Sequence, residues 1–208
     1  MANVIKLRKG LDVNLKGKAA KEEFQVKKPA VYALMPDDFT GMKPKVVVKE
    51  NDVVKVGDSL FVDKNHPEIK FVSPVSGRVT MVERGDRRKV LSVRVEADAE
   101  QQYVDFGKKN VGQMTAQEVK DLLLESGLFG FFRQRPYDVT ANPSDTPKAI
   151  FVSAFNSMPL AADFEYVLRG READFQAGLD ALAKMAKTYL GVSSKQTATA
   201  LTAAKNVE

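Results

Sequence analysis

The chain has 208 residues, no cysteine and a formal net charge of +5. The absence of cysteine excludes disulfide frameworks, thiolate metal sites, iron–sulfur ligation and thiol nucleophiles, and it fits a reducing cytosol. With 44% hydrophobic and 28% charged residues, the composition is that of a globular protein with a buried core. The uncharged apolar stretches, such as residues 149–155, are much shorter than the roughly 18 residues that a membrane span needs. Residues 1–10 also lack the apolar core of a signal peptide, so any membrane association is expected to be peripheral.

The positive charge is concentrated at the N-terminus. Residues 1–30 hold eight Lys or Arg and three Asp or Glu, so they account for the net charge of +5 of the whole chain. The remaining residues are neutral overall, which argues against nucleic-acid binding because such proteins carry a basic face on the folded body. Two interpretations stay open for this stretch. It is either a solvated arm or an arm that docks on an acidic partner or anionic lipid, with Lys6, Arg8 and Lys9 as candidate contacts.

Residues 44–95 predict a small all-β barrel or sandwich. Short β-branched runs alternate there with turns rich in Asn, Asp, Gly and Pro, a spacing typical of antiparallel folds. The predicted strands are residues 46–48, 53–56, 60–62, 69–72, 78–82 and 90–95.

After residue 97 the pattern changes to helices and a parallel sheet. Thr115 and Glu118 form a capping box that predicts a helix ending near residue 126. Residues 149–154 are an apolar run of the kind buried on both faces of a parallel sheet, and residues 188–192 predict a second strand after a helix. This is one βαβ unit, and residues 193–208 predict a further helix.

A two-stranded parallel sheet cannot cover its own faces and edges, since most open α/β sheets have about four strands or more. We therefore expect residues 148–208 to be the start of a larger Rossmann-like domain. The alternative is that these elements pack against the β region as one compact α+β body.

The most unusual stretch is residues 127–136, where bulky rings and arginines stand beside two glycines. These rings make a poor phosphate cradle, and they suit either a flat apolar slot or docking surface, or a hydrophobic anchor beneath the linker. The candidate residues are Phe129, Phe131, Phe132, Arg133 and Arg135.

A second candidate is the loop after the strand that ends at Ala154, because open α/β sheets bind ligands beyond the carboxyl ends of their strands. Asn156 and Leu160 are its candidate residues, and we expect this loop to lie beside residues 127–136. The lone His66 lies in a turn without further metal ligands, and no serine has the context of a nucleophile. The sequence therefore predicts no metal site and no catalytic residue.

Two segments, residues 56–64 and 73–79, resemble the biotinyl/lipoyl barrel-sandwich hybrid. Asp63 and Lys64 are similar to the Asp-Lys pair of a lipoyl hairpin, but residues 65–68 depart from that motif. Lipoylation of Lys64 is therefore not expected.

The whole chain resembles the A subunits of sodium-translocating NADH:quinone oxidoreductases, a family related to the C subunit of the Rnf complex. The resemblance runs in order from the N-terminus to Val192 and covers what would be the N-terminal half of such a protein. It rests on residues 7–12, 32–34, 41–44, 125–128, 132–136 and 158–163, together with the two barrel segments.

This resemblance implies a peripheral subunit on the cytoplasmic face of a bacterial inner-membrane complex that oxidises NADH, reduces ubiquinone or menaquinone, and pumps sodium. In that family the flavins and the iron–sulfur centre lie on other subunits, and the A subunits have been connected with quinone. The wider relatives carry a glycine-rich loop at the place of residues 127–135 and an acidic stretch near residues 156–158, and both are lost here. The resemblance therefore implies that this chain binds no flavin or NADH tightly, is not catalytic alone, and has the other subunits as partners.

The predicted fold class is therefore α+β in two parts. A basic arm (1–30) precedes a barrel-sandwich hybrid domain (31–97), a helical linker with the Phe/Arg-rich loop (98–147), and the start of a Rossmann-like α/β domain (148–208). The alternative function is a lipoyl- or biotinyl-like carrier or docking module of a transport complex.

Overall fold

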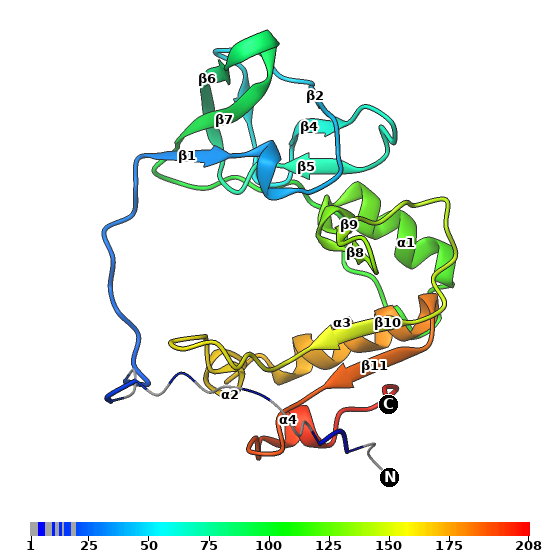
Figure 1. Ribbon diagram of the computed structural model, residues 1–208. Coiled ribbons are helices and arrows are strands. Elements are labelled where there is room, and N and C mark those ends of the chain that lie inside the picture. Colours follow the sequence, from blue (N-terminus) through cyan, green and yellow to red (C-terminus); the bar gives the residue numbers. More distant parts are fainter. Residues whose placement is uncertain (1–3, 7–9, 11–12, 14, 18–19) are drawn as a thin grey trace. The chain divides into compact units, whose positions relative to one another are not determined.

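The computed structural model describes residues 4–6, 10, 13, 15–17 and 20–208 (Figure 1). The chain forms two compact units, each described here by itself. The β unit comprises residues 26–109 and 117–146, and the α/β unit comprises residues 1–25, 110–116 and 147–208.

Two antiparallel sheets build the β unit. The four-stranded sheet has the order β1-β7-β6-β3, and the three-stranded sheet has the order β2-β4-β5. The strands are β1 (Val31–Leu34), β2 (Pro44–Val46), β3 (Val53–Val54), β4 (Ser59–Asp63), β5 (Lys70–Val72), β6 (Gly77–Arg84) and β7 (Val90–Ala97). Short 3-10 turns lie at η1 (Pro36–Asp38) and η2 (Asp86–Arg88).

The core of the β unit lies between these sheets. Leu60 and Phe61 from β4 are fully buried, and so are Val79 of β6 and Val93 of β7. Gly77 allows β6 to approach β7 closely, because a Cβ atom there would lie 1.8 Å from the carbonyl oxygen of Glu96. Inward-facing apolar residues from both sheets thus form one core, as the strand pattern predicted.

Residues 117–146 complete the β unit. The chain here forms most of α1 (Ala116–Glu125), then η4 (Leu128–Phe131) and a small hairpin of β8 (Arg133–Gln134) and β9 (Val139–Thr140). Val119 of α1 is buried, and Leu123 and Leu124 pack against the barrel core. The helix predicted from the capping box is confirmed, and it ends before Gly127, which has the left-handed φ of 76°.

The α/β unit contains the predicted βαβ element. β10 (Ile150–Ser153) pairs in parallel with β11 (Thr188–Gly191), and the connection between the two strands contains α3 (Glu172–Met185), as Figure 1 shows. The unit also holds η3 (Val111–Gln113) and the short helices α2 (Phe164–Val167) and α4 (Thr199–Thr202).

Two expectations for this unit are wrong. Phe151 on β10 is 78% exposed, so the strand is not buried on both faces within the described residues. Its ring stacks on Tyr189 of β11, with 5.1 Å between the centroids, on the exposed face of the sheet. The predicted helix over residues 193–208 is only the four-residue α4, because the preceding residues form a turn in which Ser193 donates its N–H to Gln196.

Candidate functional site

The Phe/Arg-rich loop is held against β5 by its glycines. A Cβ atom on Gly127 would lie 2.6 Å from Cγ1 of Val72, and one on Gly130 would lie 2.7 Å from the ring of Phe71. Both distances are far below an ordinary contact, so only glycine lets the backbone approach this closely. These glycines therefore serve packing between η4 and β5.

The three phenylalanines of the loop point in different directions. Phe129 is buried in the core of the β unit and stacks on the half-buried Phe132, with 5.5 Å between the ring centroids. Phe131 is 68% exposed and touches Phe39 edge-on at 5.7 Å. Phe129 and Phe132 thus pack inward, as a hydrophobic anchor would, while Phe131 remains available at the surface.

The two arginines also differ in their surroundings. Arg133 donates from its guanidinium to the carbonyl oxygens of Asp38, at 3.0 Å, and Asp138, at 3.4 Å. These bonds tie the β8–β9 hairpin to the η1 turn and use much of its donor capacity. Arg135 is highly exposed and has an ion pair of 3.6 Å with Asp138.

An exposed aromatic and basic surface remains on this segment. We call it the 131–137 surface; it consists of Phe131, Arg135 and Tyr137, whose side chains all lie largely in solvent. Tyr137 was not singled out from the sequence, although its position two residues after Arg135 on the same loop was a usable signal.

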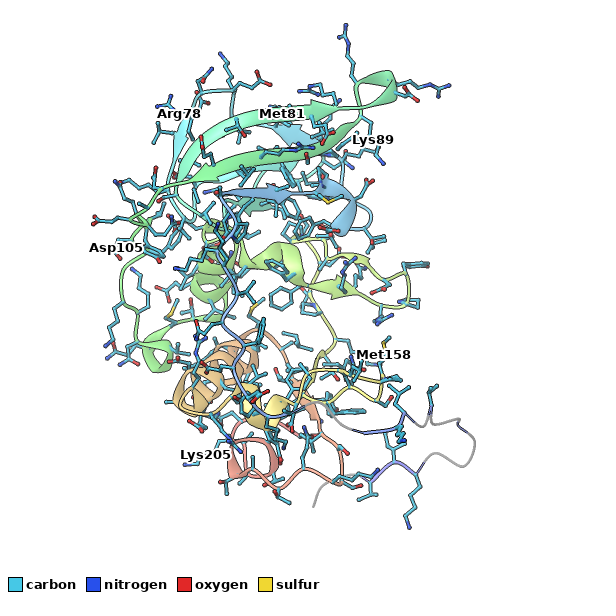
Figure 2. The ribbon with its side chains drawn as sticks, turned by 90° about the vertical axis from the view of Figure 1, so that its left-hand side faces the viewer. Arg78, Met81, Lys89, Asp105, Met158 and Lys205 are labelled. Atoms are coloured by element: carbon cyan, nitrogen blue, oxygen red, sulfur yellow. The ribbon has the colours of Figure 1, made fainter. Side chains whose placement is uncertain are left out.

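The second candidate loop follows the carboxyl end of β10, where open α/β sheets bind ligands. Asn156 accepts a hydrogen bond from the N–H of Met158 at 2.9 Å, which folds the loop back on itself. Leu160 has a left-handed φ of 60° and is 77% exposed. The side chain of Met158, labelled in Figure 2, is also exposed, so the loop presents an apolar surface. Asn156 and Leu160 belong to the α/β unit and the 131–137 surface to the β unit, so their expected proximity stays a prediction.

Of the candidate contacts in the basic arm, Lys6 is exposed, whereas Arg8 and Lys9 lie outside the described residues. A lysine further along the arm has an acidic partner within the chain. Lys21 forms an ion pair of 2.5 Å with Asp163, and this contact holds the pKa of that carboxyl below its usual value. Asp163 also accepts hydrogen bonds from the backbone N–H groups of Glu165 and Tyr166 in α2, so one carboxylate caps a helix and anchors the arm.

A second carboxylate beside it fixes the entrance to α4. Glu165 accepts hydrogen bonds from the N–H groups of Ala198 and Thr197, and these bonds lower the pKa of its carboxyl. No sequence motif pointed to the Lys21–Asp163 pair or to the bonds that Glu165 accepts, because these partners are remote in the chain.

The described part of the chain offers little for metal chemistry. Within it, no group of three or more His, Cys, Asp or Glu side chains is placed to hold a metal ion. His66 lies 3.6 Å from the carboxylate of Glu68 in its turn. Among the helices of the described residues, none is long and apolar enough to cross a membrane.

Two sheets around a common core, joined to a βαβ element, define a barrel-sandwich hybrid protein with an appended α/β domain. Residues 5–98 match the family described as the NqrA N-terminal barrel-sandwich hybrid domain. Residues 114–208 match the NqrA second alpha/beta domain. The chain therefore belongs to the NqrA family, and the fold class expected from the sequence is confirmed.

Curated relatives that carry the name of the A subunit of the Na(+)-translocating NADH-quinone reductase agree with this assignment. The protein from Pseudomonas aeruginosa (strain UCBPP-PA14) is 35% identical over 190 residues, which cover 90% of this chain and 42% of the relative. The protein from Serratia proteamaculans (strain 568) is 37% identical over 186 residues, 88% of this chain and 41% of the relative. The chain thus spans about two fifths of the length of these relatives.

Proposed function

We propose that this chain acts as part of the A subunit of a sodium-translocating NADH:quinone oxidoreductase. The observation that carries the proposal is the identity of 35% to 37% with proteins of that name over about nine tenths of the chain. The chain then belongs to a peripheral subunit on the cytoplasmic face of the bacterial inner membrane. Its partners are the other subunits of the complex, and the oxidation of NADH takes place on those subunits.

The chain itself holds no flavin in this proposal. The glycines at positions 127 and 130 support it, because they pack against Val72 and Phe71 and are not free to bring backbone N–H groups around a phosphate. A flavin absorbance that stays with the purified chain through gel filtration would contradict this part of the proposal.

The 131–137 surface is the part of this chain that we assign to quinone access or to contact with a neighbouring subunit. A quinone needs apolar rings beside one or two hydrogen-bond donors, and this segment exposes a ring at Phe131 and donors at Arg135. Phe131 is exposed although its neighbours Phe129 and Phe132 pack inward, so its position is not explained by the core of the β unit.

The test replaces Phe131 and Arg135 with alanine, singly, in the complex purified from membranes. Tyr103→Ala is the matched control, because this ring is 67% exposed and lies on another segment of the β unit. A raised KM for quinone with intact assembly supports quinone access, and loss of assembly with a folded subunit supports subunit contact. If both variants behave like Tyr103→Ala, the 131–137 surface has neither role.

The alternative function, a carrier or docking module, has one structural observation in its favour. Lys64 is exposed in the turn between β4 and β5 and is anchored there by a bond from its N–H to the carbonyl oxygen of Lys43 at 2.7 Å. Mass spectrometry of the protein from its native host distinguishes the two functions, because a carrier shows an added lipoyl or biotinyl mass on Lys64.

A further inference from the structure

The turn between β6 and β7 is closed by its own backbone. The N–H of Gly85 donates to the carbonyl oxygen of Lys89 at 2.8 Å, and the N–H of Arg88 donates to the carbonyl oxygen of Gly85 at 3.2 Å. A third bond runs from the N–H of Lys89 to the carbonyl oxygen of Asp86 at 3.1 Å. These bonds hold the turn in one conformation. We call residues 84–89 the arginine tip.

Two neighbouring arginines of the arginine tip have a left-handed backbone. The φ angles are 51° at Arg87 and 63° at Arg88, whereas Gly85 has an ordinary φ of −95°. A Cβ atom makes the left-handed region unfavourable, and glycine or asparagine adopts it more readily than arginine. Strain of this kind is concentrated at functional positions. The folding of the turn therefore does not explain why arginines occupy these two positions.

The charges of the arginine tip are only partly neutralised. Lys89 pairs with Asp37 at 2.6 Å, which ties the base of the tip to η1. Arg84 donates to the carbonyl oxygen of Arg88 at 3.4 Å. The side chains of Arg87 and Arg88 are exposed, and neither guanidinium has an ion pair or hydrogen bond with any of the described residues. Two adjacent guanidinium groups are thus free to bind a partner.

We infer that the arginine tip is a docking site for an acidic surface of another subunit, with Arg87 and Arg88 each pairing with a carboxylate. The planar guanidinium fits a carboxylate with two parallel hydrogen bonds, which makes arginine well suited to ion pairs at interfaces. This inference rests on the proposed function, which supplies the partner subunits. It concerns a different segment of the β unit from the 131–137 surface.

The composition and backbone of the arginine tip favour an acidic protein over a membrane. Residues 84–89 include no apolar side chain that would insert between lipids. Attraction to anionic lipid depends on the number of charges near the surface and places no demand on the conformation of a turn. A strained, closed turn instead holds its guanidinium groups at set positions, which benefits binding when the carboxylates of the partner are fixed too.

The test measures rebinding of the chain to the complex, which is purified from membranes of the native host and stripped of this subunit. Arg87→Asn/Arg88→Asn removes both charges and suits the left-handed backbone, so we expect an unchanged or higher Tm. Its Kd should be about tenfold higher than that of the original chain at low salt. The difference should shrink at high salt, because exposed ion pairs are screened.

The matched control is Arg78→Gln/Lys55→Gln, which removes two exposed charges from the same unit. Arg78 lies near the start of β6, at the opposite end of the hairpin from Lys89, as the labels in Figure 2 show. We expect this control to bind like the original chain. Arg87→Lys/Arg88→Lys keeps both charges without the planar fork, so it should recover only part of the affinity that the asparagine variant loses.

Three results would overturn the inference. If the asparagine variant and the control have equal Kd values, the arginine tip is not a docking site, while binding of the original chain still supports the proposed function. If the original chain itself does not rebind, the proposed function fails and the inference fails with it. If the asparagine variant loses binding to vesicles of phosphatidylglycerol and phosphatidylethanolamine but keeps its Kd for the complex, the arginine tip binds lipid.

Discussion

Phe129→Ala tests whether the Phe/Arg-rich loop belongs to the core of the β unit. The ring is 5% exposed, lies in the core cluster and stacks on Phe132. Truncation of a buried phenylalanine costs about 3–5 kcal/mol, and the lost ring pair adds about 0.5–1.5 kcal/mol. We therefore expect the free energy of unfolding of the β unit to fall by at least about 3 kcal/mol.

Phe131→Ala is the matched control. It removes the same kind of side chain two residues after Phe129, at a position that is 68% exposed. Its expected cost is below about 1 kcal/mol, mainly the edge contact with Phe39. Amide hydrogen exchange of β4, in the core of the β unit, measures both free energies without interference from the α/β unit. Equal costs for the two variants would refute the assignment of Phe129 to the core and Phe131 to the surface.

Two further predictions concern packing and charge. Gly130→Ala should destabilise the β unit by about 1–3 kcal/mol, because the added Cβ atom meets the ring of Phe71. Gly178→Ala on α3 adds a Cβ atom that meets nothing within 4 Å, so it should stabilise the α/β unit by about 0.5–1 kcal/mol. Urea titration measures both changes. Asp163→Asn should lower stability at neutral pH and have little effect in strong acid. The pKa of Asp163 is lowered by Lys21, so its stabilisation is present above its unfolded pKa of about 3.9 and is lost as the pH falls through the lowered folded pKa. Thermal melts from pH 7 to about pH 2 check this, and a constant difference across that range contradicts it.

Local sequence patterns predicted much of the fold. The strands β4 to β7 and helix α1 lie close to their expected ranges, because β-branched alternation and a capping box act within a few residues. Strand β1 was not predicted. Val31–Leu34 is a strand because it pairs with residues 93–96 of β7, which are remote in the sequence.

The candidate site shows the same division. The sequence identified the unusual loop from its composition, since three phenylalanines and two arginines beside glycines stand out without any structure. Which of the phenylalanine rings points into the core and which points to solvent depends on the surface that η4 packs against. Gly127 and Gly130 fit against Val72 and Phe71 of β5, and this fit turns Phe129 toward the core.

The sequence by itself thus determined the family, the two kinds of domain and the basic character of the N-terminal arm, because motifs and periodicity are properties of neighbouring residues. Only the tertiary structure decided that Lys21 of the arm pairs with Asp163, and that Glu208 bonds to the edge of β11. Each of these contacts joins residues that the chain brings together only after its helices and sheets have packed, so no local pattern specifies them.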